Sequence, residues 1–205
     1  MSKMKIIGFD PSMSNWGVAK ATLDLDTLKI TVDELAVVQT ENEKDKKMKK
    51  VVRKNSEDLE RAKLLHAGAM GAVEGRWLAF VEVPVGSQSS RAMASYGVCI
   101  GVLAAVGRAV PLIQVTPTEV KVAGTGIKTA TKEEMIEAAM KKYPEAPWPT
   151  KKIKGVVTPI ASQCEHMTDA VFAIEAGIAT DEFRQMIAMY KSTPMFTRAL
   201  ATEEV

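Results

Sequence analysis

The sequence predicts an α/β fold in which a mixed β-sheet carries helices on both of its faces. Two observations lead to this prediction: three strand-like segments open the chain, and segments with the patterns of strands and helices then alternate. A meander of strands followed by alternating strands and helices is the chain order of such a layered sheet. The 205 residues, 46% hydrophobic and 25% charged, suit one globular domain with insertions, with two small domains as the alternative.

The opening segments are predicted to form a β-meander. Residues 5–9 are a short apolar run, long enough for one buried strand. Residues 16–23 and 28–38 follow as two further strands, and residues 24–27 form the turn between them.

A basic segment comes next. Residues 44–54 hold six lysines and one arginine against one aspartate, in a chain whose net charge is only +2. Together with the lysines of 120–132 and 151–154, this run is expected to line one groove for a polyanion. A solvated basic surface is the alternative, and Lys128 is assigned to it.

The middle of the chain is predicted to alternate helices with two more strands. Apolar residues recur at three- and four-residue steps over 56–75, which predicts a helix that Gly75 ends. Residues 77–83 and 110–115 are strand-like. Residues 92–107 carry no charge but are too short to span a membrane, so we expect a helix buried against the sheet or against a second subunit. The stripe expected to be buried on the first helix comprises Leu59, Ala62, Leu65, Ala69 and Val73.

Two capping boxes mark helix starts in the second half of the chain. Thr116 stands three residues before Glu119, with a proline at the first helical position. Thr131 stands three residues before Glu134, and this box is predicted to open a helix that runs through Lys142.

The last third of the chain is predicted to contain a loop, a long helix and a tail. Residues 143–159 contain four prolines and are therefore assigned to a loop. A third capping box, Ser162 with Glu165, is predicted to open a helix with an apolar stripe from Met167 to Ile178. The helical signal fades after Tyr190.

The two cysteines and the N-terminus indicate an intracellular protein. Cys99 and Cys164 have no metal-ligand spacing and form no disulfide framework, which suits a reducing cytosol. Cys164 and His66 are assigned to packing. The first ten residues contain no long apolar stretch and end on an acid, so no signal peptide is expected.

Three acids stand where packing alone would not place them. Asp10 ends the first strand, Glu82 lies near the end of the fourth, and Asp169 borders the apolar stripe of the last long helix. Buried acids are costly unless they are paired or bind a metal. The alternatives are a turn position for Asp10 and a solvated helix edge for Asp169. A glutamate inside an apolar strand is harder to explain structurally.

A histidine extends this set of acids. His166 precedes Asp169 by three residues, so both lie on one helix face and could share a cation; a surface histidine is the alternative. Oxygen ligands with at most one imidazole favour Mg²⁺ or Mn²⁺ over zinc, and such sites bind phosphate substrates.

Four segments resemble the RuvC-type Holliday junction resolvases of the ribonuclease-H-like nuclease superfamily. They are IIGFDPSMSNWGVA at 6–19, FVEVP at 80–84, TEVKVAGTGIKTATKEEM at 118–135 and HMTDAVFAI at 166–174. Their order and spacing match the family over about residues 4–180. The first segment alone also resembles the phosphate-loop strand of actin-like kinases and the YqgF-type nucleases.

The resemblance implies a ribonuclease-H-like, five-stranded mixed sheet with helices on both faces over residues 1–180. A C-terminal helix and a flexible tail would follow at 181–205. Val85 stands where many members of the family carry an aromatic residue that stacks on a junction base.

The resemblance also implies which residues act. The family's metal-binding set falls on four positions, with histidine as an accepted variant at the third: Asp10, Glu82, His166 and Asp169. Lys121 and Lys132 match two lysines that the family places beside the scissile phosphate.

The activity implied is that of a crossover junction endodeoxyribonuclease. Such an enzyme resolves Holliday junctions, and in some cases other branched DNA, as a homodimer, by paired phosphodiester hydrolysis that leaves 5′-phosphates. It uses two Mg²⁺ ions per active site, with Mn²⁺ as a substitute, and neither a small-molecule cofactor nor a membrane. The long basic stretches at 41–54 and 143–160 make a phage-encoded member plausible, acting in DNA recombination or repair in the bacterial cytoplasm.

Other functions fit part of the same pattern. A YqgF-like RNA-directed nuclease shares the first motif, although such proteins are shorter. A sugar-kinase-like ATPase shares it too but needs two such domains. A catalytically inactive nucleic-acid-binding module of the same fold is the non-enzymatic alternative.

Overall fold

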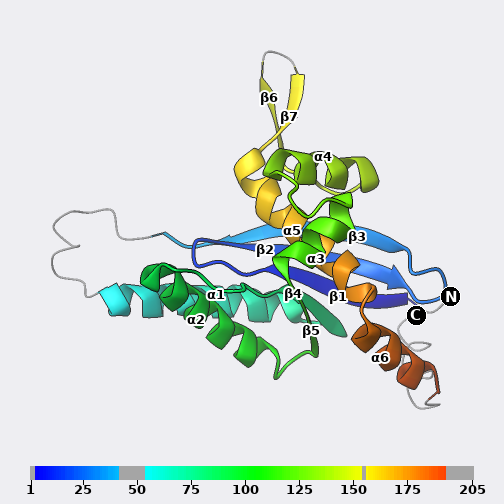
Figure 1. Ribbon diagram of the computed structural model, residues 1–205, viewed down its shortest axis with the longest axis horizontal. Coiled ribbons are helices and arrows are strands. Elements are labelled where there is room, and N and C mark those ends of the chain that lie inside the picture. The colour runs from blue at the N-terminus through cyan, green and yellow to red at the C-terminus, as the bar shows by residue number, and fades with distance from the viewer. Residues whose placement is uncertain (1–2, 42–53, 154–155, 193–205) are drawn as a thin grey trace.

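Five strands form one mixed sheet in the order β3-β2-β1-β4-β5 (Figure 1). The computed structural model describes residues 3–41, 54–153 and 156–192. The antiparallel meander comprises β1 (Lys3–Asp10), β2 (Asn15–Asp24) and β3 (Ile30–Gln39). Two further strands extend the sheet parallel to β1, namely β4 (Leu78–Glu82) and β5 (Leu112–Val115). The mixed sheet predicted from the sequence is confirmed.

Helices cover both faces of this sheet, as predicted. One face is covered by α1 (Lys54–Val73) and α2 (Ser90–Val106). The other face is covered by α3 (Pro117–Thr125), α4 (Lys132–Lys142), α5 (Ala161–Ile178) and α6 (Asp181–Ser192). Alternate residues of a strand point to opposite faces, so Ile6 packs in the core on the α5 side while Ile7 packs on the α1–α2 side.

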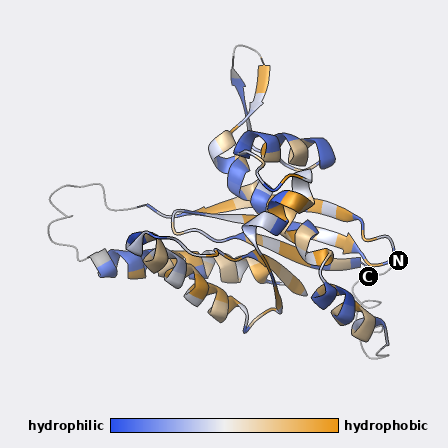
Figure 2. Ribbon diagram, viewed as in Figure 1, coloured by the Kyte–Doolittle hydropathy of each residue, from blue (hydrophilic) through white to orange (hydrophobic). Residues whose placement is uncertain are grey.

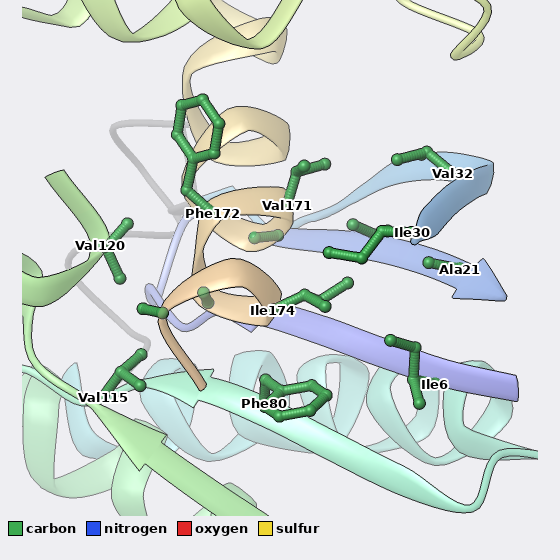
Figure 3. Packing of buried hydrophobic residues seen from close by; sticks show 14 of the residues in the cluster. Ile6, Ala21, Ile30, Val32, Phe80, Val115, Val120, Val171, Phe172 and Ile174 are labelled. Carbon is green, nitrogen blue, oxygen red and sulfur yellow. The ribbon is translucent and has the colours of Figure 1, made fainter. Parts of the chain in front are cut away.

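Helix α5 lies across the strands and forms the centre of the larger core. Figure 3 shows Val171 and Ile174 of α5 above the side of the sheet that carries Ile6 and Phe80. In Figure 2 the strands of the sheet are largely hydrophobic, whereas α4 and α6 mix hydrophilic and hydrophobic residues. The larger core therefore surrounds α5. The first turns of this helix lie at the end of the sheet where β1 ends.

Two glycines let α5 approach the strands closely. A Cβ atom at Gly8 of β1 would lie 2.0 Å from the carbonyl oxygen of Ala170, and one at Gly17 of β2 would lie 2.0 Å from that of His166. Any side chain at either position would push the helix away from the sheet. The two glycines thus allow the helix that carries His166 to contact β1, which ends at Asp10, and its neighbour β2.

The capping boxes at Thr116 and Thr131 are confirmed, because each threonine side chain accepts from the backbone of the glutamate three residues later. The prediction of a third capping box, Ser162 with Glu165, is wrong. Helix α5 begins at Ala161, and its N-cap residue Ile160 makes no side-chain capping bond. Ser162 lies inside the helix, and Glu165 forms an ion pair with Lys132 instead.

The assignment of residues 143–159 to a loop is also wrong in part. Strands β6 (Thr150–Ile153) and β7 (Val156–Pro159) form a separate antiparallel hairpin. Four-residue strands that bury no face lack the alternation by which strands are recognised in a sequence. Pro159 is compatible with the hairpin because it ends an edge strand.

Two further predictions are wrong, those on Leu59 and His66, and two are confirmed, the helix stop at Gly75 and the burial of α2 against the sheet. Leu59, placed in the buried stripe of α1, is 56% exposed, and His66, assigned to packing, is exposed. Gly75 adopts a left-handed φ of 68° two residues after α1 ends, as a helix stop should. Helix α2 buries one face, but Ile100 is exposed on another.

Some predictions fall on residues outside the described ranges. These predictions concern the basic segment up to residue 53, Lys154 and the tail after residue 192. Within the described ranges, no helix is long and apolar enough to cross a membrane.

Candidate active site

Two of the predicted acids lie side by side at the carboxyl edge of the sheet. Asp10 is the last residue of β1, and Glu82 is the last residue of β4. The two strands are parallel neighbours in which Phe9 pairs with Val81, so the residues that follow each pair are adjacent. In open α/β sheets, the carboxyl ends of parallel strands are where ligands bind.

The other two predicted residues reach this edge from α5. His166 and Asp169 lie one turn apart on the same face of the helix. The Nδ1 atom of His166 is 2.6 Å from Oδ2 of Asp10, and both side chains are partly buried. The fold therefore brings together four residues that three separate segments of the sequence contribute.

The carboxylates of this cluster destabilise one another's charged forms. Burial raises the pKa of Glu82 to about 8, and the charges of Asp10 and Asp169 add to the effect. Burial also raises the pKa of Asp169 to about 7, and the charges of Asp10 and Glu165 add to it. Among the described residues, neither Glu82 nor Asp169 has a hydrogen bond or an ion pair.

His166 partly offsets this negative charge. Its hydrogen bond with Asp10 raises the pKa of the imidazole, although burial opposes the shift. The Asp10 carboxylate thus stabilises the protonated imidazole relative to the neutral one, and in the protonated ring Nδ1–H donates to Asp10. A protonated imidazole cannot ligate a metal, so a cation bound here would compete with this proton.

The donor set suits a hard divalent cation. Partly buried carboxylates whose pKa values are raised by mutual repulsion are stabilised by an added positive charge. The described residues nevertheless contain no group of three or more His, Cys, Asp or Glu side chains already placed around one metal position. Because His166 is hydrogen-bonded to Asp10, metal binding would require these side chains to rearrange.

The two predicted lysines approach the cluster from α3 and α4. The charge of Lys121 lowers the pKa values of both Glu82 and Asp169, which places it near them. Lys132 is the first residue of α4, and its Nζ forms an ion pair with Glu165 of α5. Lys128 is exposed, in agreement with its assignment to the solvated surface.

Sequence reasoning missed the role of Glu165. The apparent capping box supplied a structural explanation, and nothing local links residue 165 to residue 132. In the structure, Glu165 holds Lys132 and adds negative charge near Asp169. It is a fourth acidic residue at the edge of the site.

A buried arginine behind the site was also missed. Arg61 of α1 is only 4% exposed, and its Nη2 donates to the carbonyl of Met13 at 2.8 Å and to Oγ of Ser14 at 2.9 Å. Its Nε donates to Oγ1 of Thr40 at 2.9 Å. These bonds hold the turn that follows Asp10. An arginine in a highly charged helix has the pattern of a surface residue, so no signal in the sequence indicates this role.

Solved structures with this fold include two of Thermus thermophilus RuvC and one from yeast. RuvC in complex with a Holliday junction substrate matches with a TM-score of 0.58 and 18% identity, over 85% of this chain and 96% of RuvC. A second RuvC structure gives 0.55 and 20%, over 82% and 94%. The yeast mitochondrial Holliday junction resolvase Ydc2 gives 0.53 and 11%, over 90% and 85%.

No protein-family model and no curated protein matches the chain. The likeness to the solved structures is one of fold, and it covers most of each chain. This chain therefore has the fold of the RuvC-type resolvases, as the four sequence segments predicted.

Proposed function

We propose that this protein is a metal-dependent, structure-selective DNA endonuclease that resolves Holliday junctions and other branched DNA. The observation that carries the proposal is the meeting of Asp10, Glu82, His166 and Asp169 at the carboxyl edge of the sheet. The fold supports it, because the similar solved structures are Holliday junction resolvases.

The four clustered residues would hold Mg²⁺, or Mn²⁺ in its place. Asp10 would contribute to two ion positions, Glu82 to one of them, and His166 with Asp169 to the other. When bound, two such ions activate a water molecule and stabilise the leaving 3′ oxygen, which leaves a 5′-phosphate. Ion binding requires the proton on His166 to leave and the hydrogen bond with Asp10 to open.

The two lysines would act on the phosphate. Lys121 lies near Glu82 and Asp169, where its ammonium would offset negative charge that develops on the scissile phosphate. Lys132 would do the same once a phosphate oxygen replaces the Glu165 carboxylate as its partner. In the free protein, Glu165 keeps Lys132 beside the site.

Paired cuts at a four-way junction require two active sites, so we propose a homodimer. One exposed side of α2 offers a surface for a second copy. Ile100 and Met93 are nearly half exposed there, and Cβ atoms added at Gly97 and Gly101 would meet open space. Small residues of this kind allow two helices to approach closely.

The His166–Asp10 hydrogen bond favours one second candidate, a nucleic-acid-binding module without catalysis. In such a module the imidazolium would neutralise Asp10 permanently, and no metal would enter. A YqgF-like RNA-directed nuclease would use the same residues on a different substrate.

Cleavage assays separate these functions. The protein would be incubated with Mg²⁺ and a mobile four-way junction, a linear duplex of equal sequence, or a structured RNA. The proposal predicts paired nicks with 5′-phosphates in the junction and little cutting of the duplex. Cleavage of RNA alone would favour the YqgF-like activity, and binding without cleavage would favour the inactive module.

A further inference from the structure

The β6–β7 hairpin is the one part of the described chain that stands clear of the body of the molecule. Its strands pair with each other and belong to a sheet separate from the five-stranded one. Figure 1 shows the hairpin projecting past α4, away from the main sheet. A ribbon that packs on no core contributes little to folding, so its composition needs another explanation.

Both faces of the hairpin are exposed, and each carries a lysine and a valine. Lys152 is paired with Val157, so the two side chains share one face. Lys151 and Thr158 are paired on the opposite face, where Val156 also lies. Val156 and Val157 are 65% and 59% exposed. In Figure 2, β6 is hydrophilic and the first part of β7 is hydrophobic, so each face combines positive charge with an apolar side chain.

The base of the hairpin is tied to the helix that carries the candidate site. The backbone N–H of Ile160 donates to the carbonyl oxygen of Pro149 at 2.9 Å, which closes the base. Sγ of Cys164, in the first turn of α5, lies 3.5 Å from the same oxygen. The hairpin thus leads directly into the helix that bears His166 and Asp169.

The dimensions suit a DNA groove. Strands of four residues span about 13 Å, and a major groove of about 12 Å admits a two-stranded ribbon. His166 lies five residues into α5, about 7.5 Å along the helix. With Ile160 as the link between β7 and α5, the far end of the ribbon is therefore within roughly 25 Å of His166. One turn of duplex is about 34 Å, so the ribbon and the site can reach the same duplex arm.

We propose that the β6–β7 hairpin is a DNA-binding arm that enters the major groove of the duplex next to the scissile phosphate. Lys151 and Lys152, on opposite faces, contact the phosphates of the two groove walls. The exposed valines contact base edges, where thymine methyl groups are apolar partners. This inference rests on the proposed function and names a contact through which the protein holds one arm of its branched substrate.

Salt-dependent binding tests the arm directly. Lys151→Ala/Lys152→Ala would be compared with a matched control, Lys3→Ala/Lys5→Ala, which removes two exposed lysines at the opposite end of β1 from Asp10. Binding of a fluorescent four-way junction and of a linear duplex would be followed by anisotropy in EDTA, which prevents cleavage. Loss of two phosphate contacts should reduce the slope of log K against log salt by about 1.8. The control should keep the parent's slope.

A crosslink locates the contact without relying on affinity. Val157→Cys would carry a photoactivatable group, and labelling is selective because Cys99 and Cys164 are buried. The expected adduct lies in a duplex arm within one turn of the cut, and the same label at Lys5→Cys should give none there. Adducts with a second protein chain, or none with DNA, would overturn the inference.

The outcomes separate the arm from the function. The parent could cleave the junction while the hairpin variants bind with the parent's slope and give no DNA adduct. In that case the proposal of a DNA-binding arm is wrong, whereas the proposed nuclease function is supported. If the parent fails to bind branched DNA at all, both proposals are wrong.

Discussion

Helix α5 carries three carboxylates, and two of them, Asp169 and Glu175, have different surroundings. Glu175 is 8% exposed, but it accepts a hydrogen bond from the Tyr143 hydroxyl at 2.7 Å and forms an ion pair with Lys142. Asp169 has no such partner among the described residues, and burial and its acidic neighbours raise its pKa to about 7. A positive charge contacts Glu175 directly, whereas His166 and Lys121 act on Asp169 without a direct bond to it.

The difference separates a structural acid from a functional one. A buried carboxylate with two internal partners is complete and stabilises the fold. A cluster in which partly buried carboxylates such as Glu82 and Asp169 have no directly bonded counter-charge is costly in the empty protein, and it gains most from a cation that comes from outside. Asp169 and Glu82 therefore belong to the site, whereas Glu175 belongs to the core.

The largest expected effect is on cleavage. Asp10→Asn should reduce junction cleavage by more than about a hundredfold, the upper range for losing a residue that merely supports a metal ligand. Junction binding should be largely kept, because it rests on distributed phosphate contacts. Glu175→Gln is the matched control and should cleave at nearly the parent's rate. Equal losses in both variants would mean that the contrast has no functional meaning.

The second effect is on stability. Glu175→Gln removes a charged acceptor from two partners and should destabilise the protein by about 1–3 kcal/mol. In a protein of this size, each kcal/mol lowers Tm by about 2–4 °C. Asp169→Asn should instead raise the Tm of the metal-free protein, since it relieves repulsion. Thermal unfolding in EDTA at pH 8 makes the comparison, and destabilisation by both substitutions would contradict it.

The metal-free protein should also lose stability as pH rises. The pKa values of Glu82 and Asp169 are raised from 4.5 and 3.8 to about 8 and about 7 in the folded state. The folded protein thus binds more protons than the unfolded chain in this range. The corresponding stability is complete below about pH 4 and is lost as pH rises through 7 and 8. His166, whose pKa is also raised, acts in the same direction.

Glu82→Gln isolates one part of this pH effect. Its amide does not ionise, so the fall in Tm between pH 5 and pH 8 should be shallower than in the parent, both in EDTA. Parallel curves for the two proteins would show that Glu82 ionises normally in the folded state.

A smaller effect concerns the acid limb of the activity profile. Metal binding needs His166 neutral, and its hydrogen bond with Asp10 raises the pKa of the imidazole. Activity at limiting Mg²⁺ should therefore fall as pH decreases through the histidine range. In His166→Asp the contribution of the imidazole should be absent, so that the acid limb changes shape and reports only the carboxylates of the cluster. Superimposable acid limbs in the parent and the variant would show that His166 does not bind the metal.

The site was more predictable from the sequence than its surroundings. Asp10 and Glu82 could be recognised because each ends an apolar strand, where an acid is conspicuous. The spacing of His166 and Asp169 fixes them on one helix face whatever the fold. Arg61 could not be found, because its partners are a carbonyl and hydroxyls on distant segments.

The errors in the fold prediction have a similar physical cause. Apolar periodicity locates elements that pack on the core, so the five central strands were found within a few residues of their ends. The β6–β7 hairpin packs on no core and has no such pattern. Ser162 and Glu165 match a capping box in sequence, but α5 begins two residues too early for Ser162 to cap it.

Metal-induced stabilisation tests the central claim most directly. Tm would be measured at pH 8 against rising Mg²⁺ or Mn²⁺ for the parent, Asp10→Asn and Glu175→Gln. A site for the metal predicts a rise in the parent that approaches about 2.7 kcal/mol of stabilisation at one hundred times Kd. The same rise should occur in Glu175→Gln and be lost in Asp10→Asn. An equal rise in all three proteins, or none in the parent, would contradict the claim that the cluster around Asp10 takes its missing positive charge from a divalent ion.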